Sequence, residues 1–394
     1  MRFRDVKHQE RALSILRRAL ASGRTHHAYL FDGPDGVGKE LAARALAARL
    51  LCNLPPDANA GMDACGTCAS CKLFAGGSHP DFHLIERSLH KLHPEPNERR
   101  KKGLELGVNV VRHFLIDHAS ASPAVGRRRI FVVREAERMN EEAQNALLKT
   151  LEEPPGSACL VLVTSSAARL LSTIRSRCQR IPFGLLPPAF VREKLVTLAS
   201  MNDETATALA RLCDGRLGVA LRWHKIDLLA AVDSLAGTLG LCIDEPDRFA
   251  KAVLETTNEL ALRAKKADTP AAEALDEPLP EIEAAADEDE DEEAESRASS
   301  KKIATDQLRD ATRLSLLVVA TLLRDALLAG ENAGAMQIFG KQAVVRQLSQ
   351  RWSQDELSDA IRAIATAETM IERNVSPQLA LERFAAAARG AAGV

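Results

Sequence analysis

The sequence predicts an α/β domain organised around a parallel sheet, followed by a small helical segment and an all-helical C-terminal region. Short apolar runs such as 129–133 (RIFVV) and 159–163 (CLVLV) alternate with helical patterns, as they do where strands are buried on both faces. A glycine-rich octamer at 33–40 lies between a predicted strand and a predicted helix. Apolar residues at helical spacing fill 305–328 and 355–389.

The length and the apolar runs set the class of protein. A chain of 394 residues is long enough for two or three domains with cores of their own. It contains no apolar run of about eighteen residues, and its first residues, MRFRDVKHQERAL, lack the apolar stretch of a signal peptide. We therefore expect a cytoplasmic protein without a membrane partner.

The net charge of −2 conceals a segregation of charge along the chain. Residues 268–296 include 14 acidic residues and no Lys or Arg, so the rest of the chain carries +12. Because such a segment cannot bury a core, we predict a disordered acidic insertion at about 267–302. The basic remainder is compatible with a nucleic-acid partner and equally with an ordinary solvated surface.

The octamer GPDGVGKE has the context of a phosphate-binding loop. It follows a predicted strand at 26–31 and begins a predicted helix at 41–51, so its amides and the helix dipole would converge on one point. The residues expected around a phosphate are Gly33, Gly36, Gly38, Lys39 and Glu40.

Glu40 departs from the phosphate-loop pattern, which has Ser or Thr at this position as a magnesium ligand. A carboxylate about 5 Å from a phosphate charge is repelled by roughly 3 kcal/mol at an effective dielectric of about 20. The loop is therefore expected either to keep the fold without a useful nucleotide or to bind ATP through a bridging magnesium ion.

Four cysteines lie close together in the sequence. Cys65, Cys68 and Cys71 have two residues between each pair, and Cys52 ends the preceding predicted helix. Four thiolates close a tetrahedral shell around zinc and leave no open position for water, so we predict a structural zinc site. The alternative is four reduced, buried thiols. The other cysteines are dispersed along the chain and are expected to be small core residues: Cys159, Cys178, Cys213 and Cys242.

Two motifs carry a resemblance to a known family. ALLKTLEEPP at 146–155 and TIRSRC at 173–178 resemble the clamp-loader branch of the AAA+ family, and within it the delta-prime group of bacterial DNA polymerase III. The resemblance implies an AAA+ domain over 1–184, a helical lid over 185–225, and a helical collar over 226–394. In the family, the collar holds several subunits in a ring.

The resemblance also assigns roles to single residues. Glu135 matches the family's catalytic Glu, and Arg134 occupies the position of its magnesium-binding Asp. Thr164 stands where the family senses the outer phosphate. The lid pattern Gly-x-x-Arg has Gly218 in place of Arg, with Arg216 two positions away. Three parts of an ATPase are thus altered: Glu40, Arg134 and Gly218.

The resemblance also implies that Arg177 acts on the ATP of a neighbouring subunit, because a guanidinium supplied by another subunit stabilises charge on a transferred phosphoryl group. We therefore predict a non-hydrolysing clamp-loader subunit within the DNA polymerase III holoenzyme. Its expected partners are the delta and gamma/tau subunits, the beta sliding clamp and primer–template DNA. The alternative for Arg177 is an ion pair within its own domain. The alternatives for the chain are an ATP-hydrolysing motor subunit and a stand-alone P-loop kinase.

Overall fold

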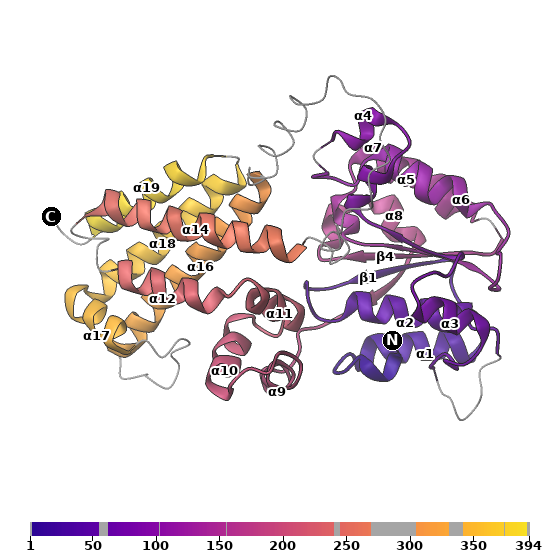
Figure 1. Ribbon diagram of the computed structural model, residues 1–394, viewed down its shortest axis with the longest axis horizontal. Coiled ribbons are helices and arrows are strands. Elements are labelled where there is room, and N and C mark those ends of the chain that lie inside the picture. The colour runs from indigo at the N-terminus through magenta and orange to yellow at the C-terminus, as the bar shows by residue number, and fades with distance from the viewer. Residues whose placement is uncertain are drawn as a thin grey trace, which may run out of the picture. The chain divides into compact units, whose positions relative to one another are not determined.

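The computed structural model describes residues 2–54, 62–101, 103–154, 156–239, 245–268, 305–330, 342–373 and 375–391. The chain divides into two compact units, one of Met1–Thr197 with Cys213–Val219 and one of Leu198–Leu212 with Ala220–Val394 (Figure 1). The predicted acidic insertion lies, after its first two residues, outside the described part of the chain. Within the described ranges, no helix is long and apolar enough to cross a membrane.

The predicted parallel sheet is confirmed in the first unit. Five parallel strands are ordered β2-β3-β4-β1-β5. Their bounds are β1 Ala28–Asp32, β2 Phe82–Ile85, β3 Arg129–Val133, β4 Ala158–Thr164 and β5 Gln179–Pro182. Since all strands are parallel, the residues that follow them meet at one edge, where α/β proteins bind ligands.

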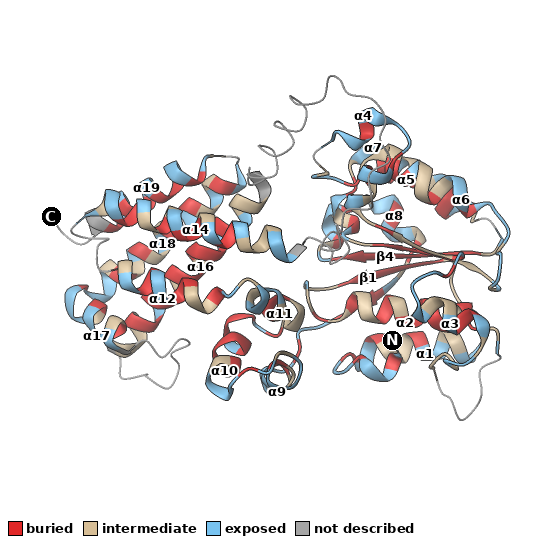
Figure 2. Cartoon of the chain, viewed as in Figure 1, coloured by how far each residue is buried: buried red, intermediate tan, exposed pale blue. Residues whose placement is uncertain are grey.

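Helices cover both faces of the sheet, so the strands are buried on both sides (Figure 2). On one face, Leu30 and Phe131 pack in a core cluster with Leu115 and Leu147 of the covering helices. On the other face lies α2, which contacts β1, β3 and β4. The longer helices of this unit are α1 Glu10–Ala21, α2 Lys39–Leu51, α3 Ala69–Ala75, α7 Glu141–Glu152, α8 Ser172–Arg177 and α9 Pro188–Ala199.

Short elements complete the first unit. They are η1 Phe3–Asp5, η2 Arg87–Leu92, α4 Pro96–Arg99, α5 Val108–Val111, η3 Arg112–Ile116, α6 Asp117–Ala119, η4 Ala136–Arg138 and η5 Ala167–Arg169. The single helix predicted over 106–119 begins at Val108 and is interrupted by η3, which has π-helical geometry.

The second unit is helical, as predicted. Its helices include α10 Asp203–Leu212, α12 Leu228–Thr238, α14 Pro246–Asp268, α16 Thr305–Gly330, α17 Gln342–Arg351, α18 Gln354–Glu372 and α19 Pro377–Ala391. Helix α11 Leu217–Lys225 has its first residues in the first unit and the rest in the second. The single helix predicted over 355–389 is wrong, because two helices, α18 and α19, occupy that range. Pro377 begins α19, and a proline has no N–H to continue a preceding helix.

Asp81 organises the loop that leads into β3. Its fully buried carboxylate accepts N–H bonds from Ala124 at 2.6 Å, Val125 at 2.8 Å and Gly126 at 2.7 Å. Burial alone would raise the pKa of Asp81, but these N–H groups outweigh it and hold the pKa below its ordinary value of 3.8. The ionised carboxylate therefore stabilises the fold above about pH 4, and this contribution is lost as the pH falls through the folded-state pKa.

We expect Asp81→Asn to lower the free energy of unfolding by about 2–3 kcal/mol at pH 7, because an amide cannot accept all three bonds with a full charge. Urea unfolding at pH 7 and at a series of pH values below 3.8 measures the effect, and the difference in unfolding free energy between variant and wild type should narrow as the pH falls through that range. Asp117→Asn, at an exposed position, is the matched control. Equal losses in the two variants would contradict the assignment.

Candidate functional site

The glycine-rich loop connects β1 to α2 at the carboxyl edge of the sheet, as predicted. Lys39, the first residue of α2, is buried, and its Nζ donates to the carbonyl oxygens of Gly33 at 2.6 Å and Pro34 at 2.5 Å. An ammonium group in a phosphate-binding loop ordinarily points to the outer phosphates. Here it is directed at two carbonyls of its own loop.

The backbone of the loop is in direct contact with the segment at 213–219. The amide of Gly218 donates to the carbonyl oxygen of Gly36 at 2.8 Å. Gly36 has a φ of +76°, and a Cβ added there would lie 2.7 Å from the backbone nitrogen of Val219. A Cβ on Gly218 would lie 2.9 Å from the Cα of Gly36. A side chain at either position would therefore force the two segments apart.

Gly218 stands at the position of the family's lid arginine, and nearby Arg216 does not replace it. The Nε of Arg216 donates to the carbonyl oxygen of Cys213 at 2.9 Å, within its own turn. The described contacts thus direct Arg216 to its own turn.

Glu40 and Arg134, two of the altered positions, are brought together. Arg134 follows β3, and its Nε lies 3.0 Å from Oε2 of Glu40. Its Nη1 donates to Oε2 of Glu86, the residue after β2, at 2.7 Å. Arg44, one turn along α2, donates to the other oxygen of Glu40 at 2.9 Å. The guanidinium of Arg134 therefore lies between the carboxylates of Glu40 and Glu86, next to the ends of β2 and β3 and the glycine-rich loop.

Glu135 and Thr164 also have partners within the chain. Glu135 accepts a hydrogen bond from the Nε of Arg87 at 2.8 Å and adopts a left-handed φ of +48°. The buried hydroxyl oxygen of Thr164 accepts the amide of Ser166 at 3.1 Å. In the described structure, the side chains of Glu135 and Thr164 both accept hydrogen bonds from other residues of the chain.

Arg177 ends α8 and pairs with a carboxylate of its own domain. Its Nη2 lies 2.6 Å from Oε1 of Glu152, and its Nη1 donates to the carbonyl oxygen of Thr173 at 2.9 Å. Glu152 ends α7, the helix whose predicted N-cap is confirmed by the bond from the Ala143 amide to Asn140 Oδ1. The side chains of Arg177 and Glu152 remain 34% and 49% exposed, and ion pairs so exposed contribute only about 0–1 kcal/mol.

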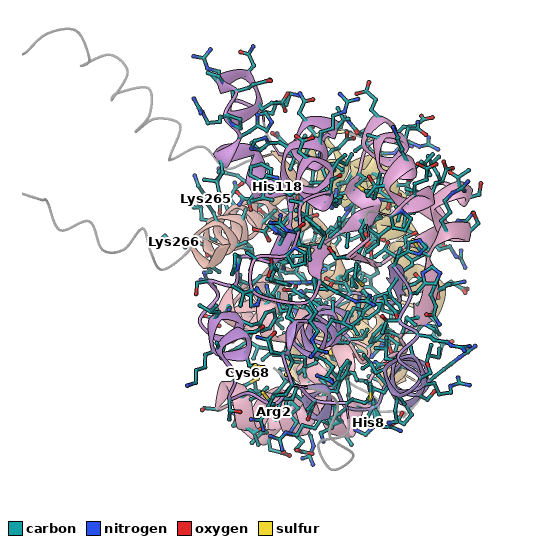
Figure 3. The ribbon with its side chains drawn as sticks, turned by 90° about the vertical axis from the view of Figure 1, so that its right-hand side faces the viewer. Arg2, His8, Cys68, His118, Lys265 and Lys266 are labelled. Carbon is teal, nitrogen blue, oxygen red and sulfur yellow. The ribbon has the colours of Figure 1, made fainter. Side chains whose placement is uncertain are left out.

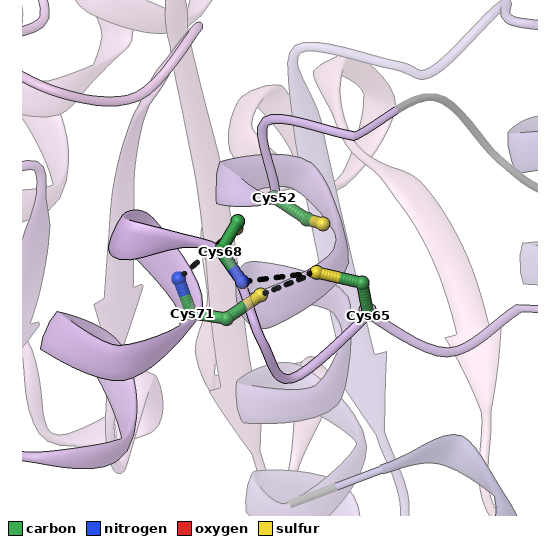
Figure 4. Close-up of side chains that lie close together, drawn as sticks. All are labelled: Cys52, Cys65, Cys68 and Cys71. Atoms are coloured by element: carbon green, nitrogen blue, oxygen red, sulfur yellow. Dashed lines mark hydrogen bonds between the residues drawn. The ribbon is translucent and has the colours of Figure 1, made fainter.

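The four predicted metal-ligating cysteines converge (Figure 4). Their sulfur atoms all lie within 4.8 Å of one another, and Cys65 Sγ is 3.8 Å from Cys71 Sγ. Zn–S bonds of about 2.3 Å in a tetrahedron place sulfurs about 3.8 Å apart, so the donor set and spacing fit zinc. Cys52 is the C-cap of α2, and Cys68 is the N-cap of α3.

Backbone groups and neighbouring segments support this cluster. The amides of Cys68 and Thr67 donate to Cys65 Sγ, each at 3.4 Å, and lower the pKa of that thiol to about 5. The N-terminus lies against the same loop, because the Phe3 amide donates to Asp63 Oδ1 at 2.6 Å. Arg2 accordingly lies near Cys68 (Figure 3). Cys159, Cys178 and Cys213 are buried elsewhere, as predicted, and Cys242 lies outside the described residues.

The sequence-based prediction did not include three residues that pair with predicted site residues: Glu86, Arg87 and Glu152. Glu86 directly follows β2, and the rule that parallel strand ends share one edge would have placed it beside Arg134. Arg87 and Glu152 carry no such signal, because each reaches a partner distant in sequence.

Over about half of its length, the chain is similar in sequence to subunits of DNA polymerase III. The family described as "DNA polymerase III, delta subunit" matches residues 8–186. DNA polymerase III subunit delta' of Pseudomonas aeruginosa is 40% identical over 188 residues, which are 47% of this chain and 51% of the relative. Subunit delta' of Escherichia coli is 32% identical over 231 residues, 58% of this chain and 63% of the relative.

A second group of relatives carries a different name. DNA polymerase III subunit gamma/tau of Mycobacterium tuberculosis is 32% identical over 317 residues, 70% of this chain and 52% of the relative. The chain thus spans roughly half to less than two thirds of the length of these relatives. A gamma-subunit-related protein of Thermotoga maritima superposes with a TM-score of 0.44 at 17% identity, covering 97% of this chain and 99% of that one.

Proposed function

We propose that this chain, which is similar to DNA polymerase III subunits delta' over about half of its length, is a non-hydrolysing, stator-like subunit of a clamp loader. In this proposal it assembles with delta and gamma/tau subunits in a hetero-oligomeric AAA+ ring. It presents Arg177 to the ATP of an adjacent motor subunit. It thereby helps to load the beta sliding clamp onto primer–template DNA in the cytoplasm.

The observation that carries the proposal is that the polar groups around the glycine-rich loop bind other groups of the same chain. Lys39 is bound to two loop carbonyls, the Gly218 amide to Gly36, and Arg134 to two carboxylates. A bound nucleotide would break these contacts, at a cost of about 1 kcal/mol for a neutral hydrogen bond and about 1.5–3 kcal/mol for a charged one. Magnesium and ATP therefore do not fit the pocket as it is built, and we assign no step to them on this chain.

The exposed ion pair of Arg177 supports the second half of the proposal. Because its pairing with Glu152 contributes little, a triphosphate with several negative charges can replace that carboxylate at small cost. Arg177 ends a short helix and its side chain is 34% exposed, so the guanidinium is partly accessible from outside the chain. Its partner in the isolated chain is then a resting contact.

Zinc is the proposed occupant of the four-cysteine cluster. With all four positions taken by sulfur, it would organise the excursion between α2 and β2 without supplying chemistry. The helices from α12 onward are proposed to form the collar through which subunits hold one another. The acidic insertion is proposed to act as a solvated spacer.

A motor subunit is the alternative that one observation favours, since the gamma/tau relatives match a larger part of the chain than the delta' relatives do. Against it stands the guanidinium at Arg134, because a cation cannot ligate magnesium. A stand-alone P-loop kinase has no comparable support.

Reconstitution tests the proposal. The chain is mixed with the delta and gamma/tau subunits of the same organism, and clamp loading onto primed DNA is compared with and without it. We expect co-elution as one complex, loading that depends on the chain, and no phosphate release from ATP by the chain alone. Turnover by the isolated chain would instead establish the motor alternative, and phosphotransfer by a monomer would establish the kinase.

A further inference from the structure

We propose that the guanidinium of Arg134 takes the place of a divalent cation between Glu40 and Glu86, so that the pocket contains a built-in cation. It follows that removing this one side chain would expose a site for magnesium or manganese that the native chain does not offer. The inference concerns this pocket alone and does not depend on assembly with other subunits.

The geometry gives Arg134 the position and contacts of a bridging cation. Its Nε lies 3.0 Å from Glu40 Oε2, and its Nη1 lies 2.7 Å from Glu86 Oε2. The two carboxylates come from different elements, one from the first turn of α2 and one from the end of β2. A positive group between them favours the ionised form of both, because like charges in one site repel.

The charges around Arg134 support the same assignment. Burial alone would lower the pKa of Arg134, but the neighbouring Glu40, Glu86 and Glu135 carboxylates raise it above its ordinary value. Burial would likewise raise the pKa of Glu86, yet hydrogen bonds from Ser88 and Arg134 hold it below its ordinary value. Arg134 and Glu86 are therefore both charged near neutral pH.

The two altered positions compensate each other. Among the described residues, Glu40 without Arg134 would lose one of its two ion pairs beside the phosphate loop, and Arg134 without Glu40 would keep its ion pair with Glu86. Arg44 also pairs with Glu40, but through its other oxygen, so it does not join the two carboxylates. The substitutions therefore act as one unit, and neither is an independent loss.

Removing the guanidinium provides the test. In Arg134→Ala, oxygen ligands from Glu40 and Glu86 face each other without a cation, and carboxylates are the ligands that magnesium and manganese prefer. We expect its Tm to be lower than that of the wild type in KCl and to rise by about 2–4 °C in 10 mM MgCl₂ at matched ionic strength. The wild-type Tm should not change. Full-length, zinc-loaded protein is used throughout.

Controls separate a created site from a general salt effect. Arg87→Ala removes a guanidinium that pairs with one carboxylate, Glu135, and should not gain a magnesium response. Arg134→Ala combined with Glu40→Gln should lose the response that Arg134→Ala gains. Electron paramagnetic resonance with Mn²⁺ should count one additional bound ion in Arg134→Ala.

Two outcomes would overturn the proposal. One is an Arg134→Ala variant that folds yet neither binds Mn²⁺ nor responds to magnesium. The other is an equal response in Arg87→Ala. Should Arg134→Ala fail to fold in KCl, Arg134→Gln carries the same comparison, because its amide keeps one hydrogen bond but no charge.

Discussion

Replacing Arg177 with Ala in a reconstituted clamp loader is expected to reduce ATP turnover at the site this arginine serves by about 10³-fold or more. The reason is electrostatic, since the guanidinium stabilises charge that develops on the γ-phosphoryl oxygens, and alanine leaves it unopposed. Total phosphate release should fall to what the remaining sites supply. Initial rates of phosphate release in the presence of clamp and primed DNA measure the effect.

The neighbouring residue Arg175 offers a matched control. It lies on the same short helix, carries the same charge and is exposed. Arg175→Ala should leave turnover close to that of the wild type, and both variants should assemble, because the ion pair lost with Arg177 contributes at most about 1 kcal/mol. Equal turnover in the Arg177→Ala and wild-type complexes would remove Arg177 from the mechanism.

Loss of the predicted zinc ion is expected to have the largest effect on stability. Structural zinc sites contribute on the order of 10 kcal/mol of binding free energy, which is comparable to the whole stability of a domain. We therefore expect Cys65→Ser to abolish zinc binding and to unfold the excursion that carries α3. Zinc content by mass spectrometry and thermal unfolding measure the two effects.

Cys178→Ser is the control for this variant, because Cys178 is buried but lies outside the cluster. It should keep one zinc ion per chain. Wild-type protein that contains no zinc and keeps its Tm in the presence of a strong chelator would show instead that the four cysteines are reduced, buried thiols.

The features predictable from the sequence are those with local signals. Apolar runs between turn residues located the strands, and the spacing of Cys65, Cys68 and Cys71 indicated that their sulfurs converge. The order of residues around the glycine-rich loop placed it between a strand and a helix, although the helix begins at Lys39, two residues before the predicted start. In each case the residues that determine the structure lie within a few positions of one another, so a local sequence pattern is enough to predict it.

The features that sequence reasoning missed depend on contacts between distant segments. The Glu40–Arg134–Glu86 arrangement joins three elements, and no single motif specifies it. The contact of Gly36 with Gly218 similarly joins residues far apart in the chain. The break between α18 and α19 was missed for a different reason, because apolar spacing continued across a proline that in fact begins a new helix.

In the proposed function, this chain contributes to ATP hydrolysis without using its own phosphate loop. The most direct test is the turnover of a reconstituted complex in which only this chain carries Lys39→Ala, measured beside the Arg177→Ala complex. We predict wild-type turnover for Lys39→Ala, because its ammonium binds carbonyls of its own loop, together with strongly reduced turnover for Arg177→Ala. Reduced turnover for Lys39→Ala with unchanged turnover for Arg177→Ala would contradict the claim.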